Sequence, residues 1–256
     1  MRNQRTIKRP VSVSGKGLHT GVKSTLTFKP APENTGYVFI RTDLEEHPQI
    51  VADIEHVVDI SRGTTIEQEG NRMHTVEHVL AALAGLNINN CFIEVNNMEP
   101  PVCDGSAIEF VKALKEAEIK EQNIPQPVLE IDKIVRYGDQ ETESEIHVIP
   151  ADTFSITCMV DYKIPELGAQ YSGTMDLYKE FEEDYASART FCFLSEVEYL
   201  KESDLIKGGD TSNALVFVDK KIDQHEIDRI KNLFDDINGD VVLGENGLLN
   251  NTELRF

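Results

Sequence analysis

Long apolar segments are missing from this sequence of 256 residues. No run approaches the roughly 18–20 consecutive apolar residues that a membrane-spanning helix needs. The basic N-terminus, residues 1–10, is not followed by the apolar stretch that marks a secretory signal peptide. The sequence therefore predicts a cytoplasmic protein that is not transmembrane.

Positive charge is also scarce. The chain has 25 lysines and arginines against 45 aspartates and glutamates, which gives a formal net charge of −20. Such a charge repels the phosphate backbone of nucleic acids, so we expect no nucleic-acid partner. A substrate that carries phosphate groups would need positive charge concentrated locally at its site.

Several common catalytic motifs are absent. No Cys-x-x-Cys pair, P-loop, G-x-G-x-x-G or G-x-S-x-G pattern occurs. The four cysteines are scattered along the chain, and we expect reduced thiols, with two disulfides as the alternative. They are Cys91, Cys103, Cys158 and Cys192.

The pattern of apolar residues predicts an α+β protein with two domains. Alternating strand-like segments are followed by helix-like segments twice, and the composition of residues 121–127 is that of a linker. We place a first domain at residues 1–122 and a second at residues 128–256. One continuous α+β domain is the alternative.

The segment from Met73 to Leu80 is the most informative local feature. A helix over residues 75–84, ended by Gly85, would bury Val76 and its apolar neighbours and present His74, Glu77 and His78 on the opposite face. A neutral imidazole can bind a metal, and a neighbouring carboxylate can accept a proton from water. His74 and His78 could form a metal-binding pair, but we favour a surface histidine at position 74.

Five segments in order resemble a known family. They are Val11 to Gly21, Thr75 to Gly85, Glu99 to Ser106, Ala188 to Phe193, and Gly208-Gly209 with the Asn213 to Val216 run. Together they closely resemble the UDP-3-O-acyl-N-acetylglucosamine deacetylases, zinc-dependent enzymes of lipid A biosynthesis, and the segment from Phe28 to Gly36 looks most like their Bacteroidetes branch. The resemblance implies two similar domains, each a mainly antiparallel sheet packed on a pair of helices, with the active site between them.

The resemblance also implies a chemistry. His78 would be a Zn²⁺ ligand, and Glu77 would be the general base for water attacking the 2-acetamido group. Thr190 would donate a hydrogen bond to the oxyanion. The products would be acetate and the free amine of UDP-3-O-acyl-N-acetylglucosamine, in the first committed step toward lipid A.

Further positions match the family's substrate site. His19 would lie at the mouth of an apolar passage for the acyl chain, Tyr162 against the nucleotide, and Asp104 as a supporting carboxylate near the helix. For Asp104, a turn residue before Gly105 is the alternative. The passage itself would be lined by Leu18, Phe191, Leu194, Val197, Ile206 and Val216, for which core packing is the alternative.

One departure from the family pattern bears on activity. The family takes its other two zinc ligands and a general acid from a segment that follows a Leu-Arg-Phe sequence, and this sequence stops at Leu254-Arg255-Phe256. We therefore expect the second domain to be incomplete at its C-terminal end. A deacetylase-like chain that binds ligands without hydrolysis is the alternative function. In the Bacteroidetes branch the enzyme is often followed by a fused 3-hydroxyacyl-carrier-protein dehydratase.

Overall fold

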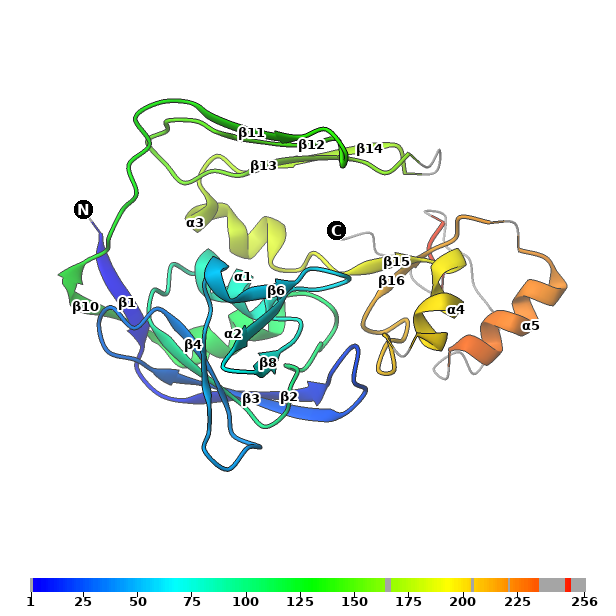
Figure 1. Ribbon diagram of the computed structural model, residues 1–256, viewed down its shortest axis with the longest axis horizontal. Coiled ribbons are helices and arrows are strands. Elements are labelled where there is room, and N and C mark those ends of the chain that lie inside the picture. Colours follow the sequence, from blue (N-terminus) through cyan, green and yellow to red (C-terminus); the bar gives the residue numbers. More distant parts are fainter. Residues whose placement is uncertain (1, 164–166, 204, 221, 235–246, 250–256) are drawn as a thin grey trace.

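The computed structural model describes residues 2–163, 167–203, 205–220, 222–234 and 247–249. Over these ranges the chain is a mixed α+β structure with several antiparallel sheets and five α-helices, so the α+β part of the predicted fold is confirmed (Figure 1). The Leu254-Arg255-Phe256 segment lies outside the described residues.

A five-stranded sheet dominates the first half of the chain. Its strands run in the order β2-β3-β9-β4-β5, and every pair is antiparallel except β4 with β9. Alternation in β3 buries Ser24, Leu26 and Phe28 on one face. The strands are β2 (Val11–Lys16), β3 (Lys23–Pro30), β9 (Cys91–Val95), β4 (Tyr37–Arg41) and β5 (Gln49–Val51).

Two smaller sheets complete this half. β1 (Asn3–Ile7) pairs with β10 (Ile119–Pro125), so most of the expected linker is a strand. A 3₁₀ turn (Ile54–His56) leads into a three-stranded sheet. This sheet consists of β6 (Val57–Asp59), β7 (Thr65–Gln68) and β8 (Asn71–Met73).

Helices α1 (Glu77–Gly85) and α2 (Ile108–Glu116) pack against each other, and α2 also contacts β2 (Figure 1). Val79 and Leu83 of α1 are fully buried, as its apolar spacing predicts. The helix begins two residues later than expected, because Thr75 adopts a left-handed conformation with φ of 54°. The first half therefore combines a main five-stranded sheet and two smaller sheets with two helices.

The second half is built differently in the described residues. Two antiparallel hairpins, β11 (Val135–Asp139) with β12 (Ser144–Val148) and β13 (Thr157–Asp161) with β14 (Ala169–Gly173), form separate two-stranded sheets. Nearly all their residues are exposed. Figure 1 shows the hairpins beside each other and away from the five-stranded sheet.

The remaining elements of the second half surround a short parallel pair, β15 (Phe191–Phe193) with β16 (Leu215–Phe217). Helix α4 contacts β15, and Ile230 of α5 belongs to the same apolar cluster as Val216. The helices are α3 (Leu177–Glu180), the π-helix that continues it (Phe181–Tyr185), α4 (Leu194–Glu202) and α5 (Gln224–Leu233). No described helix has the length and apolar character needed to cross a membrane.

The cores do not follow the expected boundary between halves. Leu177, Phe181 and Ala186 belong to the core of the first half. The Phe181 ring lies so close to Gly85 that a Cβ at position 85 would overlap it. Gly85 is the last residue of α1, and its lack of a side chain admits this ring.

The polar residues at two helix starts do not form the capping boxes that their spacing indicates. The spacing of Ser106 with Glu109, and of Ser195 with Glu198, is that of a capping box. In the structure Ser106 Oγ accepts from the N–H of Ile108 two residues on, and the Ser195 hydroxyl donates to Asp219. All four cysteines are free thiols, as expected.

Candidate active site between the two halves

Glu77 is the first residue of α1, where the helix N-terminus favours negative charge. Its Oε2 accepts a hydrogen bond from the backbone N–H of Thr64 at 3.0 Å. Its Oε1 lies 3.4 Å from the place that a Cβ would take on Gly63, with His19 Nε2 and Thr75 Oγ1 at 3.6 and 3.7 Å from the same place. A carboxylate, an imidazole and a hydroxyl therefore meet around Gly63.

His19 reaches this point from the loop after β2. Its Nδ1 faces the carbonyl oxygen of Leu205. A carbonyl oxygen can only accept a hydrogen bond, so this contact assigns a proton to Nδ1. The side chain is thereby oriented by a contact from the second half.

Glu99 lies behind this cluster and is fully buried. Its carboxylate accepts from the backbone N–H groups of His19 and Thr20, at 3.0 and 2.9 Å. It also accepts from the hydroxyls of Thr20 and Thr75, at 2.8 and 3.0 Å. We assigned Glu99 no role from the sequence, and its place in the motif before two prolines was the only signal available.

His78 is the candidate metal ligand. Burial lowers the pKa of His78, against the opposing influence of Glu77 and Asp104, so its imidazole is neutral at physiological pH. A neutral imidazole fits a zinc ligand. The described residues nevertheless contain no group of three His, Cys, Asp or Glu side chains placed to hold a metal ion.

His74 is half-buried, whereas we favoured a surface histidine from the sequence. Its Nδ1 is 3.0 Å from the Thr65 hydroxyl, and burial lowers the pKa of the ring. It lines a cavity of about 260 Å³ together with His19 and Lys207.

Asp104 forms the turn that was the alternative reading of its sequence. Its carboxylate accepts from the N–H and the hydroxyl of Ser106, at 3.1 and 2.7 Å. Gly105 follows with φ of 84°, and its carbonyl accepts from the N–H of Thr190 at 2.8 Å. This turn thus joins the first half to the start of β15.

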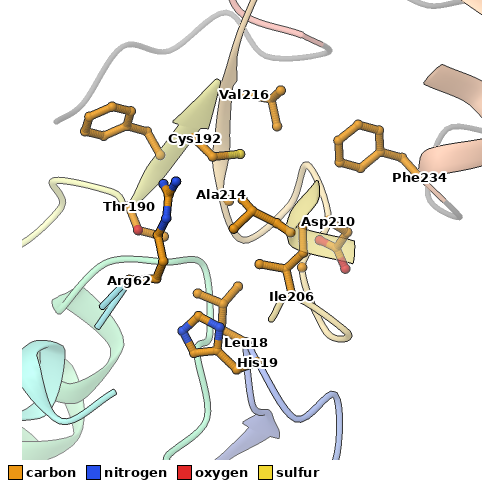
Figure 2. Close-up of a pocket in the computed structure, with 13 residues that line it drawn as sticks. Leu18, His19, Arg62, Thr190, Cys192, Ile206, Asp210, Ala214, Val216 and Phe234 are labelled. Atoms are coloured by element: carbon orange, nitrogen blue, oxygen red, sulfur yellow. The ribbon is translucent and has the colours of Figure 1, made fainter. Parts of the chain in front are cut away.

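An apolar cavity of about 60 Å³ lies next to His19, between the loop after β2 and the β15–β16 pair (Figure 2). The structure brings six of the predicted site residues to its wall: Leu18, His19, Thr190, Phe191, Ile206 and Val216. The wall also contains residues that the sequence did not suggest: Arg62, Cys192, Leu200, Gly209, Asp210, Ala214 and Phe234.

Three predicted substrate residues are not part of that wall. Leu194 and Val197 of α4 are buried behind it in the cluster that includes Val216. The Tyr162 ring packs edge-on against Phe191, with ring centroids 5.5 Å apart. Burial raises the pKa of Tyr162.

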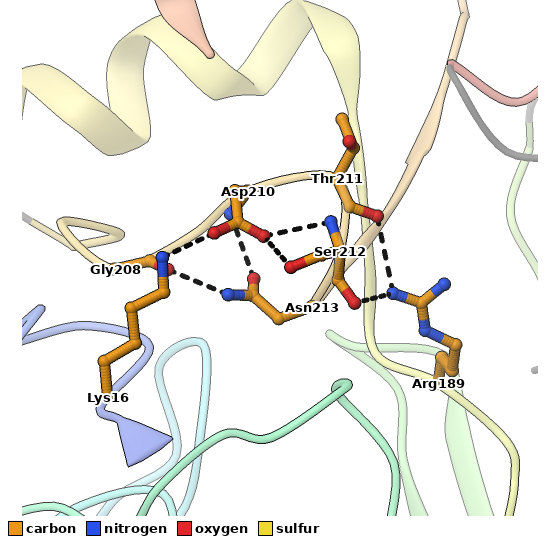
Figure 3. Close-up of polar contacts among 7 residues, drawn as sticks. All are labelled: Lys16, Arg189, Gly208, Asp210, Thr211, Ser212 and Asn213. Carbon is orange, nitrogen blue, oxygen red and sulfur yellow. Dashed lines mark hydrogen bonds and ion pairs between the residues drawn. The ribbon is translucent and has the colours of Figure 1, made fainter. Parts of the chain in front are cut away.

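Two ionic contacts hold the halves together around the cavity. Arg62 pairs with Glu196 of α4 at 2.6 Å, and this pairing raises the pKa of the arginine and lowers that of the glutamate. Lys16 at the end of β2 pairs with Asp210, as Figure 3 shows. Arg189 donates to the Ser212 carbonyl at 2.6 Å. The scarce positive charge of the chain is therefore present at the junction of the halves.

Close backbone contact reinforces this junction. The N–H of Gly208 donates to the Leu18 carbonyl at 3.0 Å, and a Cβ at position 208 would overlap the carbonyl oxygen of Gly17. Gly21, with φ of 67°, lies against the same segment. Glycines in both halves thus permit the approach that places His19 beside the cavity.

Comparison with known proteins identifies the family of this chain. The family model described as UDP-3-O-acyl N-acetylglycosamine deacetylase (LpxC) matches residues 4–244. The bifunctional enzyme LpxC/FabZ of Chlorobaculum tepidum is 50% identical over 254 residues, which are 99% of this chain and 54% of the relative. The enzyme of the same name from Bacteroides thetaiotaomicron is 40% identical, over 90% of this chain and 50% of its own length.

A shorter relative covers the same region. The UDP-3-O-acyl-N-acetylglucosamine deacetylase of Myxococcus xanthus is 41% identical over 84% of this chain and 68% of its own length. The chain spans about half the length of the two bifunctional relatives. The match over residues 4–244 establishes that this chain belongs to the UDP-3-O-acyl N-acetylglycosamine deacetylase family.

Proposed function

We propose that the natural protein containing this chain removes the 2-acetyl group of UDP-3-O-acyl-N-acetylglucosamine by hydrolysis, the first committed step toward lipid A. The observation that carries the proposal is the meeting of Glu77, His19 and Thr75 around Gly63, beside an apolar cavity with Thr190 in its wall. These groups can supply a base, a hydrogen-bond donor for an oxyanion and a place for an acyl chain.

Glu77 is the proposed general base. It would take a proton from the water that attacks the acetamide carbonyl carbon. The Thr64 N–H holds one carboxylate oxygen and leaves the other toward Gly63. The C–N bond then breaks as the amine nitrogen gains a proton, releasing acetate.

Thr190 is the proposed donor to the oxyanion that forms on the carbonyl oxygen. One well-placed donor of this kind contributes roughly 3–4 kcal/mol to transition-state stabilisation. Its backbone is held on one side by Gly105 and on the other by the N–H of Leu215, at 2.8 and 2.9 Å. These two hydrogen bonds fix the backbone of Thr190 and therefore the position of its Cα atom.

We propose Zn²⁺ as the cofactor, with His78 as one ligand. The neutral imidazole fits that role, and the remaining ligands would have to come from outside the described residues. A bound zinc ion would lower the pKa of water and polarise the carbonyl group. Asp104 influences His78 electrostatically and would support this ligand.

The apolar cavity is the proposed start of the acyl passage, with His19 at its mouth. Leu18, Phe191, Ile206 and Val216 would contact the chain, and Leu194 and Val197 would shape the passage from behind. Tyr162 would lie against the nucleotide.

Further assignments follow from family membership. We propose, as family membership implies, that residues 128–256 form a second domain after a first at residues 1–122; in the described residues its separate two-stranded sheets differ from the five-stranded sheet of the first. A cytoplasmic location is a further proposal. A fused dehydratase is another, which the bifunctional relatives favour.

A deacetylase-like protein that binds its ligand without hydrolysis is the second candidate. The observation that favours it is the missing group of three metal-holding side chains within the described residues. Release of free amine from UDP-3-O-acyl-N-acetylglucosamine by the purified natural protein separates the two. We expect turnover that a zinc chelator abolishes and added zinc restores. Substrate binding without turnover in zinc-loaded protein would favour the second candidate.

A further inference from the structure

Glu99 is a charged group in an unusual environment. Its side chain is fully buried, and the four donors to its carboxylate are two backbone N–H groups and two hydroxyls, all neutral. A buried charge is costly unless it is paired or well hydrogen-bonded. Four donors at 2.8–3.0 Å satisfy this carboxylate and fix its position.

The two carboxylate oxygens of Glu99 accept hydrogen bonds from different partners. Oε2 accepts both the N–H and the hydroxyl of Thr20. Oε1 accepts the N–H of His19 and the hydroxyl of Thr75, so one oxygen joins the loop after β2 to the residue that precedes α1.

Thr75 is strained at this point. Its φ of 54° is a left-handed conformation that a β-branched residue rarely adopts, and such conformations persist only where surrounding contacts enforce them. The hydrogen bond to Glu99 is such a contact. The next residues are Val76, whose N–H donates to the Thr64 carbonyl at 3.2 Å, and Glu77, which accepts from the Thr64 N–H.

We propose that Glu99 is a positioning residue for the deacetylation proposed above. Its carboxylate holds Thr75 in the left-handed conformation, and Thr75 in turn sets the start of α1 and therefore the place of the Glu77 carboxylate. The same carboxylate fixes the backbone of His19, so the positions of both Glu77 and His19 beside Gly63 depend on Glu99. The catalytic part of this inference rests on the proposed function.

The central variant is Glu99→Gln. In either orientation its amide places an NH₂ group against the backbone N–H of His19 or of Thr20, so one hydrogen bond is lost and the charge is removed. The matched control is Glu94→Gln, which removes a carboxylate of β9 that pairs with Lys29 at the surface. Thr75→Val removes only the hydroxyl that reaches Glu99.

We expect Glu99→Gln to lower kcat by about 10-fold to 100-fold, the size of effect that a misplaced catalytic group produces. KM should stay within about threefold, since no substrate contact is removed. Glu99→Gln should add little to Thr75→Val, because Gln weakens the charge-assisted hydrogen bond from the Thr75 hydroxyl and Thr75→Val removes that hydrogen bond altogether. An unchanged kcat, or an equal loss with and without Thr75→Val, would overturn the proposal. If Glu99→Gln does not fold, a Thr75→Val loss that Thr75→Ser avoids supports the link, and equal rates contradict it.

A readout independent of activity is the hydrogen exchange of the Thr64 amide. We expect exchange to accelerate at least about tenfold in Glu99→Gln, with the amides of β3 and β9 unchanged. If wild-type protein shows no deacetylation, the proposed function fails, whereas this exchange still decides whether Glu99 positions α1. Unchanged exchange at Thr64 would sink the positioning role by itself.

Discussion

The backbone N–H of Thr64 donates to the Glu77 carboxylate at 3.0 Å, so the loop before β7 orients a side chain at the start of α1. The N–H of Val76 returns a hydrogen bond to the Thr64 carbonyl at 3.2 Å. These two contacts fix one oxygen of Glu77 and leave the other at Gly63.

Replacing Glu77 by Gln should abolish turnover without unfolding the protein. The amide oxygen can still accept from Thr64, but the side chain cannot take a proton from water. We expect kcat to fall by at least about 100-fold. Steady-state kinetics and thermal unfolding of Glu77→Gln beside Glu109→Gln, an exposed carboxylate of α2, check this. Retained turnover would remove Glu77 from the base role.

The hydroxyl of Thr190 should act in the transition state. Thr190→Val keeps the shape of the side chain and removes the donor, and we expect kcat to fall by roughly 100-fold to 1000-fold with little change in KM. Thr190→Ser should retain most of the rate. Equal rates for the valine and serine variants would contradict an oxyanion role.

A larger side chain at position 214 should narrow the acyl passage. Ala214 lines the apolar cavity, and Ala214→Leu adds three carbon atoms to its wall. We expect kcat/KM to fall by about 10-fold or more for long acyl chains and much less for short ones. The control is Ala151→Leu at an exposed position. An equal effect on all chain lengths would place the acyl chain elsewhere.

The contact between Gly85 and Phe181 predicts a cost in stability. Gly85→Ala places a Cβ where the ring lies, and overpacking of this kind costs about 1–3 kcal/mol. Urea unfolding should show the loss in Gly85→Ala, with partial recovery when Phe181→Leu is added. Gly138→Ala, in the exposed β11 strand, should change the free energy of unfolding little. An unchanged midpoint for Gly85→Ala would show that the ring can move freely.

His74 should make stability depend on pH. Burial lowers its pKa below the ordinary value of 6.5, with Glu99 opposing the shift. The unfolded chain then binds more protons as pH falls through 6.5 toward the folded pKa, so the free energy of unfolding decreases over that window. One histidine contributes at most about 1.4 kcal/mol per pH unit. The slope should be smaller in His74→Gln, measured by urea unfolding from about pH 7.5 to about pH 5; equal slopes would contradict the shift.

Local patterns in the sequence predicted many of the elements. Apolar spacing located α1, and the order of strand-like and helix-like segments predicted the α+β class, because these signals arise within a few neighbouring residues. The bounds were less accurate. The start of α1 depends on the left-handed Thr75, which Glu99 supports from a different part of the chain.

The candidate site shows the same difference between local sequence signals and long-range contacts. The motifs made Glu77, His78 and Thr190 candidates for the site, whereas Glu99 and Arg62 emerged only from contacts between distant segments. No local pattern reports that the carboxylate of residue 99 meets the backbone of residues 19 and 20. The separate hairpins of the second half were also not predicted. The sequence of β14 has no alternation of apolar residues that would indicate a strand.

Reaction of UDP-3-O-acyl-N-acetylglucosamine with the zinc-loaded natural protein in isotopically labelled water, followed by mass spectrometry, tests the central claim most directly. Hydrolysis of the acetamide puts the label into acetate and leaves a free amine with its acyl ester intact, which is the result we predict. A released fatty acid, or substrate recovered unchanged, would contradict the deacetylase assignment.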